Sequence, residues 1–419
     1  MKNTFSAYLL SIFFIGLGFI FITPPFEAFD ENAHYSRVIE SISNNFSIKL
    51  NNIQIDKRIE NYEGPTPYTS GTPPFDDHLT YKKFFDGHYK ENFIQKYKDN
   101  SFDFSYQKGE AKINWQYQHP PLYYMVTGLI LSPFDNLSLQ SQINFLRILS
   151  FMFALIGVAI SLIAVQKFLG KHNEIFGFYF YPIFFPMFFI EFARIGNDSI
   201  CLLLNSIIFY YSLKWFKYKN HSSLFLIGIL LGVGILVKAF FIPIFISLIL
   251  FVFFIDYSSF KSKLHSFKLT TYIIFPFLIF IGLWFIFNLK VNNDFGLGSE
   301  FNQLIHTSLL DMLNNFSIQP FFRGVLVPII TFSWSGTWSF TRMPALMQIL
   351  FFLPCIYLVY FIIKNIYRQS LNQFHYLGIF LLLFFYCSLI FHVLISQVLV
   401  GLGTSGGWYF HIFFPWIGL

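Results

Sequence analysis

The chain has 419 residues, of which 55% are hydrophobic and only 12% are charged, and its mean hydropathy is +0.54. Soluble proteins of this length carry fewer apolar and more charged residues, so the composition excludes a soluble enzyme and predicts a multi-span membrane protein. The formal net charge of +6 does not predict a nucleic-acid partner, because the positions of charges in a membrane protein matter more than their sum.

The first apolar segment, Phe5 to Ile22, is about 18 residues long and ends at Thr23-Pro24-Pro25. It lacks the small-residue pattern of a signal-peptide cleavage site. We therefore predict that residues 1–23 form a retained first transmembrane helix.

Residues 24–144 contain most of the polar residues and are predicted to form a large external loop. Near its end, the segment from His119 to Phe134 is apolar but short for a membrane span of about 20 residues. Pro120 and Pro121 stand at its start, where proline suits the first turn of a helix. We interpret this segment as a juxtamembrane or re-entrant helix on the outer face.

The rest of the chain, residues 145–419, is predicted to be a multi-span domain whose basic residues mark its cytoplasmic side. They form four clusters: Lys167 and Lys171; Lys214, Lys217 and Lys219; Lys261, Lys263 and Lys268; Lys364 and Arg368. The positive-inside rule assigns such clusters to the cytoplasm. The apolar stretches between them predict an all-α integral membrane protein with about ten transmembrane helices and its N-terminus inside.

The spans after the first are expected near 145–165, 270–289, 344–363 and 375–396, with two each in 172–213 and 220–260 and an outer loop between 289 and 344. The last apolar run, Trp408 to Leu419, is short for a span and stops without a polar tail, as a truncated C-terminus would.

In this topology the unusual polar and aromatic residues of the chain fall on the outer face. They are Asp30, Glu31, His34, Arg37, His119, Arg147, Glu191, Arg194, Asn197, Asp198, Lys238, Trp334, Trp338, Arg342, Trp408, Tyr409 and His411. An ionised side chain in the bilayer costs about 2.5–3.5 kcal/mol at mid-depth, so each needs a partner, water or a function. Cations suit the phosphate of a lipid carrier, and a carboxylate suits an acceptor hydroxyl or a divalent metal.

Five motifs occur in one order along the chain: "PPFEAFDENAHYSRV", "HPPLYY", "RILS", "NDS" and "GVGILVK". In this order the sequence resembles the GT-C superfamily of polyprenyl-phosphate-sugar glycosyltransferases. The nearest branch is the bacterial GT-C-like membrane proteins of largely unassigned function. The resemblance implies a GT-C-like fold and a sugar transfer from a polyprenyl-phosphate carrier to a cell-envelope glycan, lipid or protein. The active face would be the periplasmic side of the inner membrane.

The resemblance also implies roles for individual residues. Asp30 would be the general base or a metal-associated carboxylate for Mg or Mn, and Glu31 its helper. His119 and Lys238 would lie at the donor phosphate, and Arg147 and Arg194, two cations of the predicted outer face, are predicted to bind it with them. The other site candidates are His34, Arg37, Asn197, Asp198, Trp334 and Arg342.

Simpler interpretations stay open beside these. Asp30 and Glu31 could cap a helix, Lys238 could be a snorkelling lysine at a hairpin turn, and Trp334 could belong to an interfacial belt. Glu27 is expected to be a solvated charge. The protein could also be a transporter or flippase of lipid-linked glycans, or a non-catalytic protein that binds a lipid carrier. A transporter would be expected to carry charged or broken helices at mid-membrane.

Overall fold

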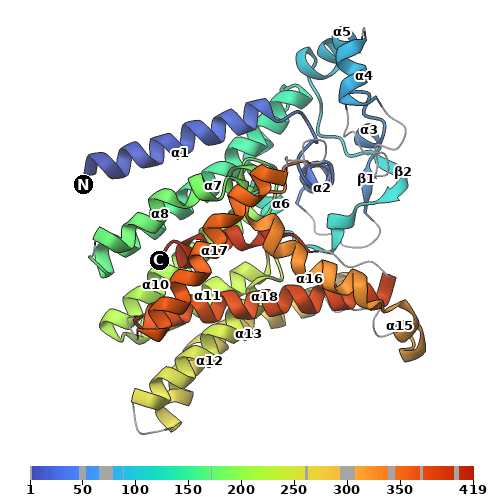
Figure 1. Cartoon of the computed structure of the whole chain (residues 1–419). Coiled ribbons are helices and arrows are strands. Elements are labelled where there is room, and N and C mark those ends of the chain that lie inside the picture. Colours follow the sequence, from blue (N-terminus) through green and yellow to red (C-terminus); the bar gives the residue numbers. More distant parts are fainter. Residues whose placement is uncertain are drawn as a thin grey trace. The chain divides into compact units, whose positions relative to one another are not determined.

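The computed structural model describes residues 2–46, 53–65, 79–87, 89–170, 172–259, 263–292, 307–337, 345–368, 371–400 and 405–419. Figure 1 labels their helices and strands. By the contacts within the chain they divide into two compact units. Unit 1 comprises residues 1–155, 189–200 and 336–343, and unit 2 comprises residues 156–188, 201–335 and 344–419. The predicted boundaries at residues 23 and 144 stay a prediction.

Unit 1 contains the external segment and the residues expected around Asp30. Its elements are α1 (Lys2–Ile22), α2 (Glu31–Ser43), β1 (Gln54–Asp56), α3 (Lys57–Glu60), α4 (Tyr81–Asp86), α5 (Tyr89–Phe93), the π-helix η1 (Ile94–Asp99), β2 (Lys108–Ile113), the 3₁₀-helix η2 (Trp115–Gln118), α6 (Leu122–Leu131), the first half of α7 (Leu139–Phe168), most of α9 (Met187–Phe192) and the start of α10 (Asp198–Tyr218). Strands β1 and β2 pair antiparallel, with Gln54 opposite Ile113 and Asp56 opposite Lys108.

Helix α6 supports the juxtamembrane interpretation of the segment after the Pro-Pro pair. It has 10 residues, which at about 1.5 Å per residue cover roughly half of a hydrocarbon core about 30 Å thick. One side of α6 packs against α2. Tyr123 and Tyr124 are buried, whereas Leu129 is 62% exposed.

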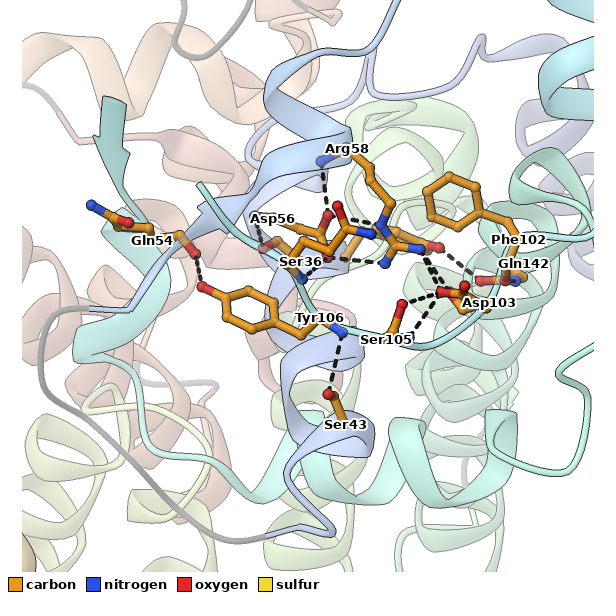
Figure 2. A network of polar contacts seen from close by, with 12 residues as sticks. Ser36, Ser43, Gln54, Asp56, Arg58, Phe102, Asp103, Ser105, Tyr106 and Gln142 are labelled. Atoms are coloured by element: carbon orange, nitrogen blue, oxygen red, sulfur yellow. Dashed lines mark hydrogen bonds and ion pairs between the residues drawn. The ribbon is translucent and has the colours of Figure 1, made fainter. Parts of the chain in front are cut away.

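The two-stranded β1–β2 sheet is fixed to the rest of unit 1 by a polar network (Figure 2). Asp56 is fully buried, and its carboxylate accepts hydrogen bonds from the backbone N–H of Arg58 at 2.9 Å and from the guanidinium Nε and Nη2 at 3.0 Å each. The backbone N–H of Asp56 donates to Ser36 Oγ on α2 at 2.8 Å. Arg58 Nη1 donates to Asp103 Oδ1 at 2.8 Å, so this network connects α2, strand β1 and the chain before β2.

The change Asp56→Asn should destabilise the β1–β2 sheet, because an amide cannot accept all the N–H groups that converge on this carboxylate. Hydrogen bonds to a charged group contribute about 1.5–3 kcal/mol each, so we expect limited trypsin cleavage after Arg58 and Lys108 to accelerate roughly tenfold or more. Glu110→Gln is the matched control, since the side chains of Glu110 and its partner Lys57 are 78% and 45% exposed and such a pair contributes little. Equal cleavage rates in the two variants would show that the Asp56 network does not stabilise the β1–β2 sheet.

Unit 2 consists of helices. They are the second half of α7, α8 (His172–Phe184), the start of α9 (Met187–Phe192), α10 (Asp198–Tyr218) from Cys201 onward, α11 (His221–Ile235), α12 (Phe241–Ser259), α13 (Lys263–Asn292), α15 (Leu309–Asn315), α16 (Ile318–Ser333), α17 (Ala345–Tyr367), α18 (Gln373–Val400), the 3₁₀-helix η3 (Gly407–Phe413) and α19 (Phe414–Ile417). Gly228 and Gly232 allow α11 to pack closely on α13, since a Cβ at either position would lie within 2.6 Å of α13 atoms.

Within the described residues, five helices are long and apolar enough to cross a membrane: Thr4–Ile22, Leu139–Phe168, Asp198–Tyr218, His265–Lys290 and Gln373–Leu399. Shorter apolar helices occupy Leu122–Leu131, His221–Ile235, Phe241–Phe254 and Phe352–Tyr367. The chain is thus an all-α multi-pass membrane protein, as its composition predicts. The sequence-based count of about ten spans includes several of these shorter helices.

The stretch between 289 and 344, predicted as an outer loop, carries the helices α15 and α16, which are bent by 73° at their junction as in a broken span or a re-entrant segment. Asp311, Asn314, Asn315 and Arg323 interrupt the apolar run, which hid these helices from a search for continuous spans. Asn315 Nδ2 donates to the Val398 carbonyl at the end of α18 at 3.1 Å, and the Tyr386 hydroxyl in the middle of α18 donates to the Val325 carbonyl at 2.9 Å.

Candidate active site around Asp30

Asp30 lies in the turn between α1 and α2, in the left-handed backbone region with φ 58° and ψ 10°. This region is uncommon for residues other than glycine, although Asp and Asn tolerate it best. Asp30 stands at the N-cap position of α2, yet its side chain makes no capping hydrogen bond. Instead its Oδ1 accepts a hydrogen bond from Trp115 Nε1 at 2.9 Å. The helix-capping interpretation of Asp30 therefore has no support in this geometry.

Glu31 and Arg147 form a fully buried, bidentate ion pair. Arg147 Nε donates to Oε1 at 2.7 Å and Nη2 donates to Oε2 at 2.6 Å, and both side chains are 0% exposed. The remaining Arg147 N–H groups donate to the carbonyls of Ile20, Thr23 and Pro24. A guanidinium has five N–H donors, so this set leaves Arg147 none for a phosphate.

The Glu31 carboxylate is likewise saturated. Besides Arg147, it accepts the backbone N–H of Phe26 at 3.0 Å and that of Ile195 at 3.3 Å. Glu31 thereby links the turn after α1 to the turn after α9. We expected Glu31 to assist Asp30 chemically and Arg147 to bind the donor, but their contacts are with each other and with the backbone.

Arg194 is the centre of a second buried cluster. Its guanidinium donates to Glu191 Oε1 at 2.6 Å, to Asp198 Oδ2 at 3.1 Å and to the carbonyl of Phe29 at 3.0 Å. Burial alone would lower the pKa of Arg194, but the charges of Glu191 and Asp198 raise it. Burial raises the pKa of Glu191 against the opposing effect of Arg194. Arg194, expected to bind phosphate, thus directs its donors at two carboxyls and the residue before Asp30.

The rest of α2 is buried among aromatic rings. His34 Nδ1 lies 2.9 Å from the Tyr124 hydroxyl, in hydrogen-bond contact. Arg37 Nη1 donates to Glu40 Oε2 at 2.6 Å, and the guanidinium lies 5.4 Å from the centre of the Tyr124 ring. His34 and Arg37, two further site candidates, therefore share Tyr124 as a neighbour.

The remaining predicted residues are distributed over both units. Asn197 is fully buried in unit 1 beside Asp198, and His119 is half-buried after η2. Trp334 is half-buried directly after α16 in unit 2. Arg342 lies outside the described residues.

Lys238 is a buried cation of unit 2, in the turn between α11 and α12. It is 5% exposed, and its Nζ lies 4.3 Å from the Phe240 ring centre and 4.5 Å from that of Tyr409. A desolvated cation–π contact of this kind contributes about 2 kcal/mol. A snorkelling lysine would extend its ammonium into water, which this burial does not fit.

Sequence reasoning missed three contributors. Trp115, which donates to Asp30, stands four residues before the "HPPLYY" motif and carries no signal of its own. The Tyr123 hydroxyl contacts Ser150 Oγ at 2.8 Å and accepts the backbone N–H of Gly196 at 3.0 Å. Glu27 was expected to be solvated, and this expectation is wrong: it is fully buried and accepts a hydrogen bond from Thr337 Oγ1 at 2.8 Å.

Among the described residues, no three or more His, Cys, Asp or Glu side chains are grouped so that they could hold a metal ion. Asp30, the residue proposed for Mg or Mn, has an indole N–H as its partner rather than further acidic ligands. The side chains described here therefore do not fit a protein-held Mg or Mn site, and we derive no reaction step through a metal.

Two solved structures are similar to this chain at low identity. They are crystal structures of ArnT from Cupriavidus metallidurans, one bound to undecaprenyl phosphate and one in the apo state. Their sequence identities to this chain are 13% and 14% and their TM-scores 0.41 and 0.40, and each match covers 100% of this chain and 76% of ArnT.

No curated protein matches the sequence. The family described as "Predicted membrane protein (DUF2142)" matches residues 13–417, nearly the whole chain. The protein therefore belongs to the DUF2142 family of predicted membrane proteins.

Proposed function

We propose that the protein is a glycosyltransferase that moves a sugar from a polyprenyl-phosphate carrier to a cell-envelope acceptor. The active face would be the periplasmic side of a bacterial inner membrane, where the basic clusters and the motif resemblance both place Asp30. The observation that carries the proposal is the exposure pattern of the acids in this cluster. Glu27, Glu31, Glu191 and Asp198 are at most 1% exposed, whereas Asp30 is half-buried.

A half-buried carboxylate can meet a substrate while buried ones cannot. In the proposed step, an Asp30 carboxylate oxygen accepts the proton of the acceptor hydroxyl, and the oxygen of that hydroxyl forms a bond to the anomeric carbon of the sugar. The bond between the anomeric carbon and the phosphate oxygen breaks, and the polyprenyl phosphate leaves with the electron pair. A cation beside the departing phosphate would stabilise its growing charge.

The geometry changes the roles of the basic residues in this proposal. Arg147 and Arg194 are assigned to holding the site, because their N–H donors are directed at carboxyls and backbone carbonyls. Lys238 and His119 keep the proposed role of donor phosphate ligands, which rests on the order of the motifs. Of the two, Lys238 offers an ammonium group, a frequent ligand of phosphate, but at 5% exposure it has to be uncovered before a phosphate can reach it.

The test is a turnover assay on purified protein in lipid nanodiscs, with radiolabelled polyprenyl-phosphate sugars as donors. Loss of the donor, by transfer or by hydrolysis to free sugar, is expected with wild type and not with Asp30→Asn. Binding of undecaprenyl phosphate without any donor loss would overturn the enzyme and favour a carrier-binding protein. Donor movement between leaflets of proteoliposomes without donor loss would favour a flippase.

Lys238→Met should weaken binding of undecaprenyl phosphate by roughly tenfold or more, because a hydrogen bond to a charged group is worth about 1.5–3 kcal/mol. Methionine keeps most of the volume and the contact with the two rings but has no charge. Lys217→Met, which removes an exposed lysine from a predicted cytoplasmic cluster, should leave binding unchanged. Native mass spectrometry of the lipid-bound fraction would measure both. Unchanged binding by Lys238→Met would show that Lys238 does not bind the phosphate and only packs against Phe240 and Tyr409.

A further inference from the structure

Two buried arginines hold the turn that presents Asp30. This turn, residues 23–30 and hereafter the exit turn, contains two non-glycine residues in the left-handed region: Phe26 with φ 59° and Asp30 with φ 58°. Such residues cost about 1–3 kcal/mol each and persist only where the surroundings impose the conformation. The structure therefore has to supply contacts that keep the exit turn in this shape.

Arg147 supplies those contacts at the start of the exit turn. Its Nη1 and Nη2 donate to the carbonyls of Thr23 and Pro24, and its ion pair positions Glu31, whose Oε2 accepts the N–H of Phe26. The first left-handed residue is thus held through its own backbone N–H. A rotation about its φ would have to move the N–H away from a buried carboxylate.

Arg194 supplies the equivalent contact at the end of the exit turn. Its Nη1 donates to the Phe29 carbonyl at 3.0 Å, and this carbonyl belongs to the peptide group that ends at the Asp30 nitrogen. Holding the carbonyl fixes the plane of that peptide group and opposes rotation of Asp30 out of its left-handed conformation. Glu191 and Asp198 hold the guanidinium in turn, at 2.6 and 3.1 Å.

We infer that Arg194, supported by Glu191 and Asp198, is a positioning residue for Asp30. Together with Arg147 and Glu31 it forms a group of side chains, hereafter the clamp, that fixes the strained exit turn and with it the position of the Asp30 carboxylate. Glu31 connects the two halves of the clamp, because it accepts N–H groups from both Phe26 and Ile195. This inference deepens the proposed function and rests on it for its catalytic meaning, but the clamp itself can be tested without any substrate.

A substitution at Gly196 can displace the Arg194 guanidinium without removing a charge. A Cβ built at this position would lie 2.7 Å from Arg194 Nη1, the atom that donates to the Phe29 carbonyl. Gly196→Ala therefore keeps every charge and displaces only the end of the guanidinium. Gly18→Ala is the matched control, because a Cβ at Gly18 meets no atom within 4 Å.

The Trp115 indole reports on Asp30, because its N–H donates to the Asp30 carboxylate. We would label the tryptophans with 5-fluorotryptophan and record ¹⁹F NMR spectra. The signal that disappears in the Trp115→Phe variant belongs to Trp115. We expect Gly196→Ala and Arg194→Lys to shift or split that signal, as Asp30→Asn does. Gly18→Ala and Arg37→Lys, the latter at another buried ion pair of unit 1, should leave it in place. An unmoved signal in both clamp variants, with the folded protein recovered, would overturn the clamp.

Turnover then separates the clamp from the enzyme proposal. If Asp30 is the base, Gly196→Ala should lower kcat by up to roughly 10²-fold while KM changes little, since a displaced catalytic group of this kind costs about that much. Wild-type protein without turnover, combined with a signal that moves as expected, would sink the glycosyltransferase proposal and leave the clamp standing. A moved signal with unchanged kcat in an active enzyme would show that Asp30 does not need the clamp.

Discussion

Replacing Arg147 with methionine should lower the free energy of unfolding by about 3–5 kcal/mol, the largest stability loss we expect from a single change in unit 1. The reason is the complete burial of the Glu31–Arg147 pair. Removing the guanidinium leaves a buried carboxylate without its counter-charge, and it also leaves the carbonyls of Ile20, Thr23 and Pro24 without their donor. Thermal and SDS-induced unfolding of the purified protein would measure the loss.

A double-mutant cycle gives this prediction its sharpest form. Glu31→Gln alone should also destabilise the protein strongly, whereas Glu31→Gln combined with Arg147→Met should lose less than the sum by on the order of 1–3 kcal/mol. Lys57→Met with Glu110→Gln is the exposed control pair, for which we expect at most about 1 kcal/mol. Additive losses for the buried pair would contradict the ion pair as the source of the effect.

The largest effect on activity is expected from Asp30→Asn, which should reduce turnover of the labelled donor by roughly 10²–10⁴-fold. Asparagine tolerates the left-handed conformation and its amide oxygen can still accept the Trp115 N–H, so fold and melting temperature should change little. What disappears is the negative charge and the ability to take a proton from the acceptor. The measurement is single-turnover donor loss in nanodiscs.

Asp103→Asn provides the same chemical change at an acid of unit 1 whose side chain is 72% exposed. We expect its turnover to stay near the wild-type value. Comparable losses in Asp103→Asn and Asp30→Asn would point to a general effect of removing an acid from unit 1. Full activity in Asp30→Asn would remove Asp30 from the reaction.

The sequence predicts the membrane class and the gathering of most of the candidate residues, because both depend on patterns along the chain. Hydropathy and basic clusters are read residue by residue, and unit 1 does bring Asp30, Glu31, His34, Arg37, Arg147, Arg194, Asn197 and Asp198 together. The contacts among them could not be predicted in the same way. Glu31 and Arg147 are 116 residues apart, and no periodicity tells which cation approaches which acid.

The distinction between a chemical and a structural charge also depends on tertiary contacts. Arg147 looked like a phosphate ligand because it begins a membrane helix on the outer side, yet three backbone carbonyls and one carboxylate take all its donors. Glu27 looked solvated because it precedes the expected start of a helix, yet Thr337, 310 residues later, donates a hydrogen bond to it. In both cases the sequence around the residue gives no indication of the distant group that it contacts.

The bent pair α15–α16 has a consequence for sidedness. Asn315 lies at the end of α18 that the basic clusters assign to the outside, and Val325 lies beside the middle of α18 at Tyr386. A bend of 73° suits either a span that is broken in its middle or a re-entrant segment that returns to the side from which it entered. A re-entrant pair adds no crossing and agrees with the predicted cytoplasmic side of Lys364 and Arg368, whereas one more crossing would place these basic residues outside, against the positive-inside rule.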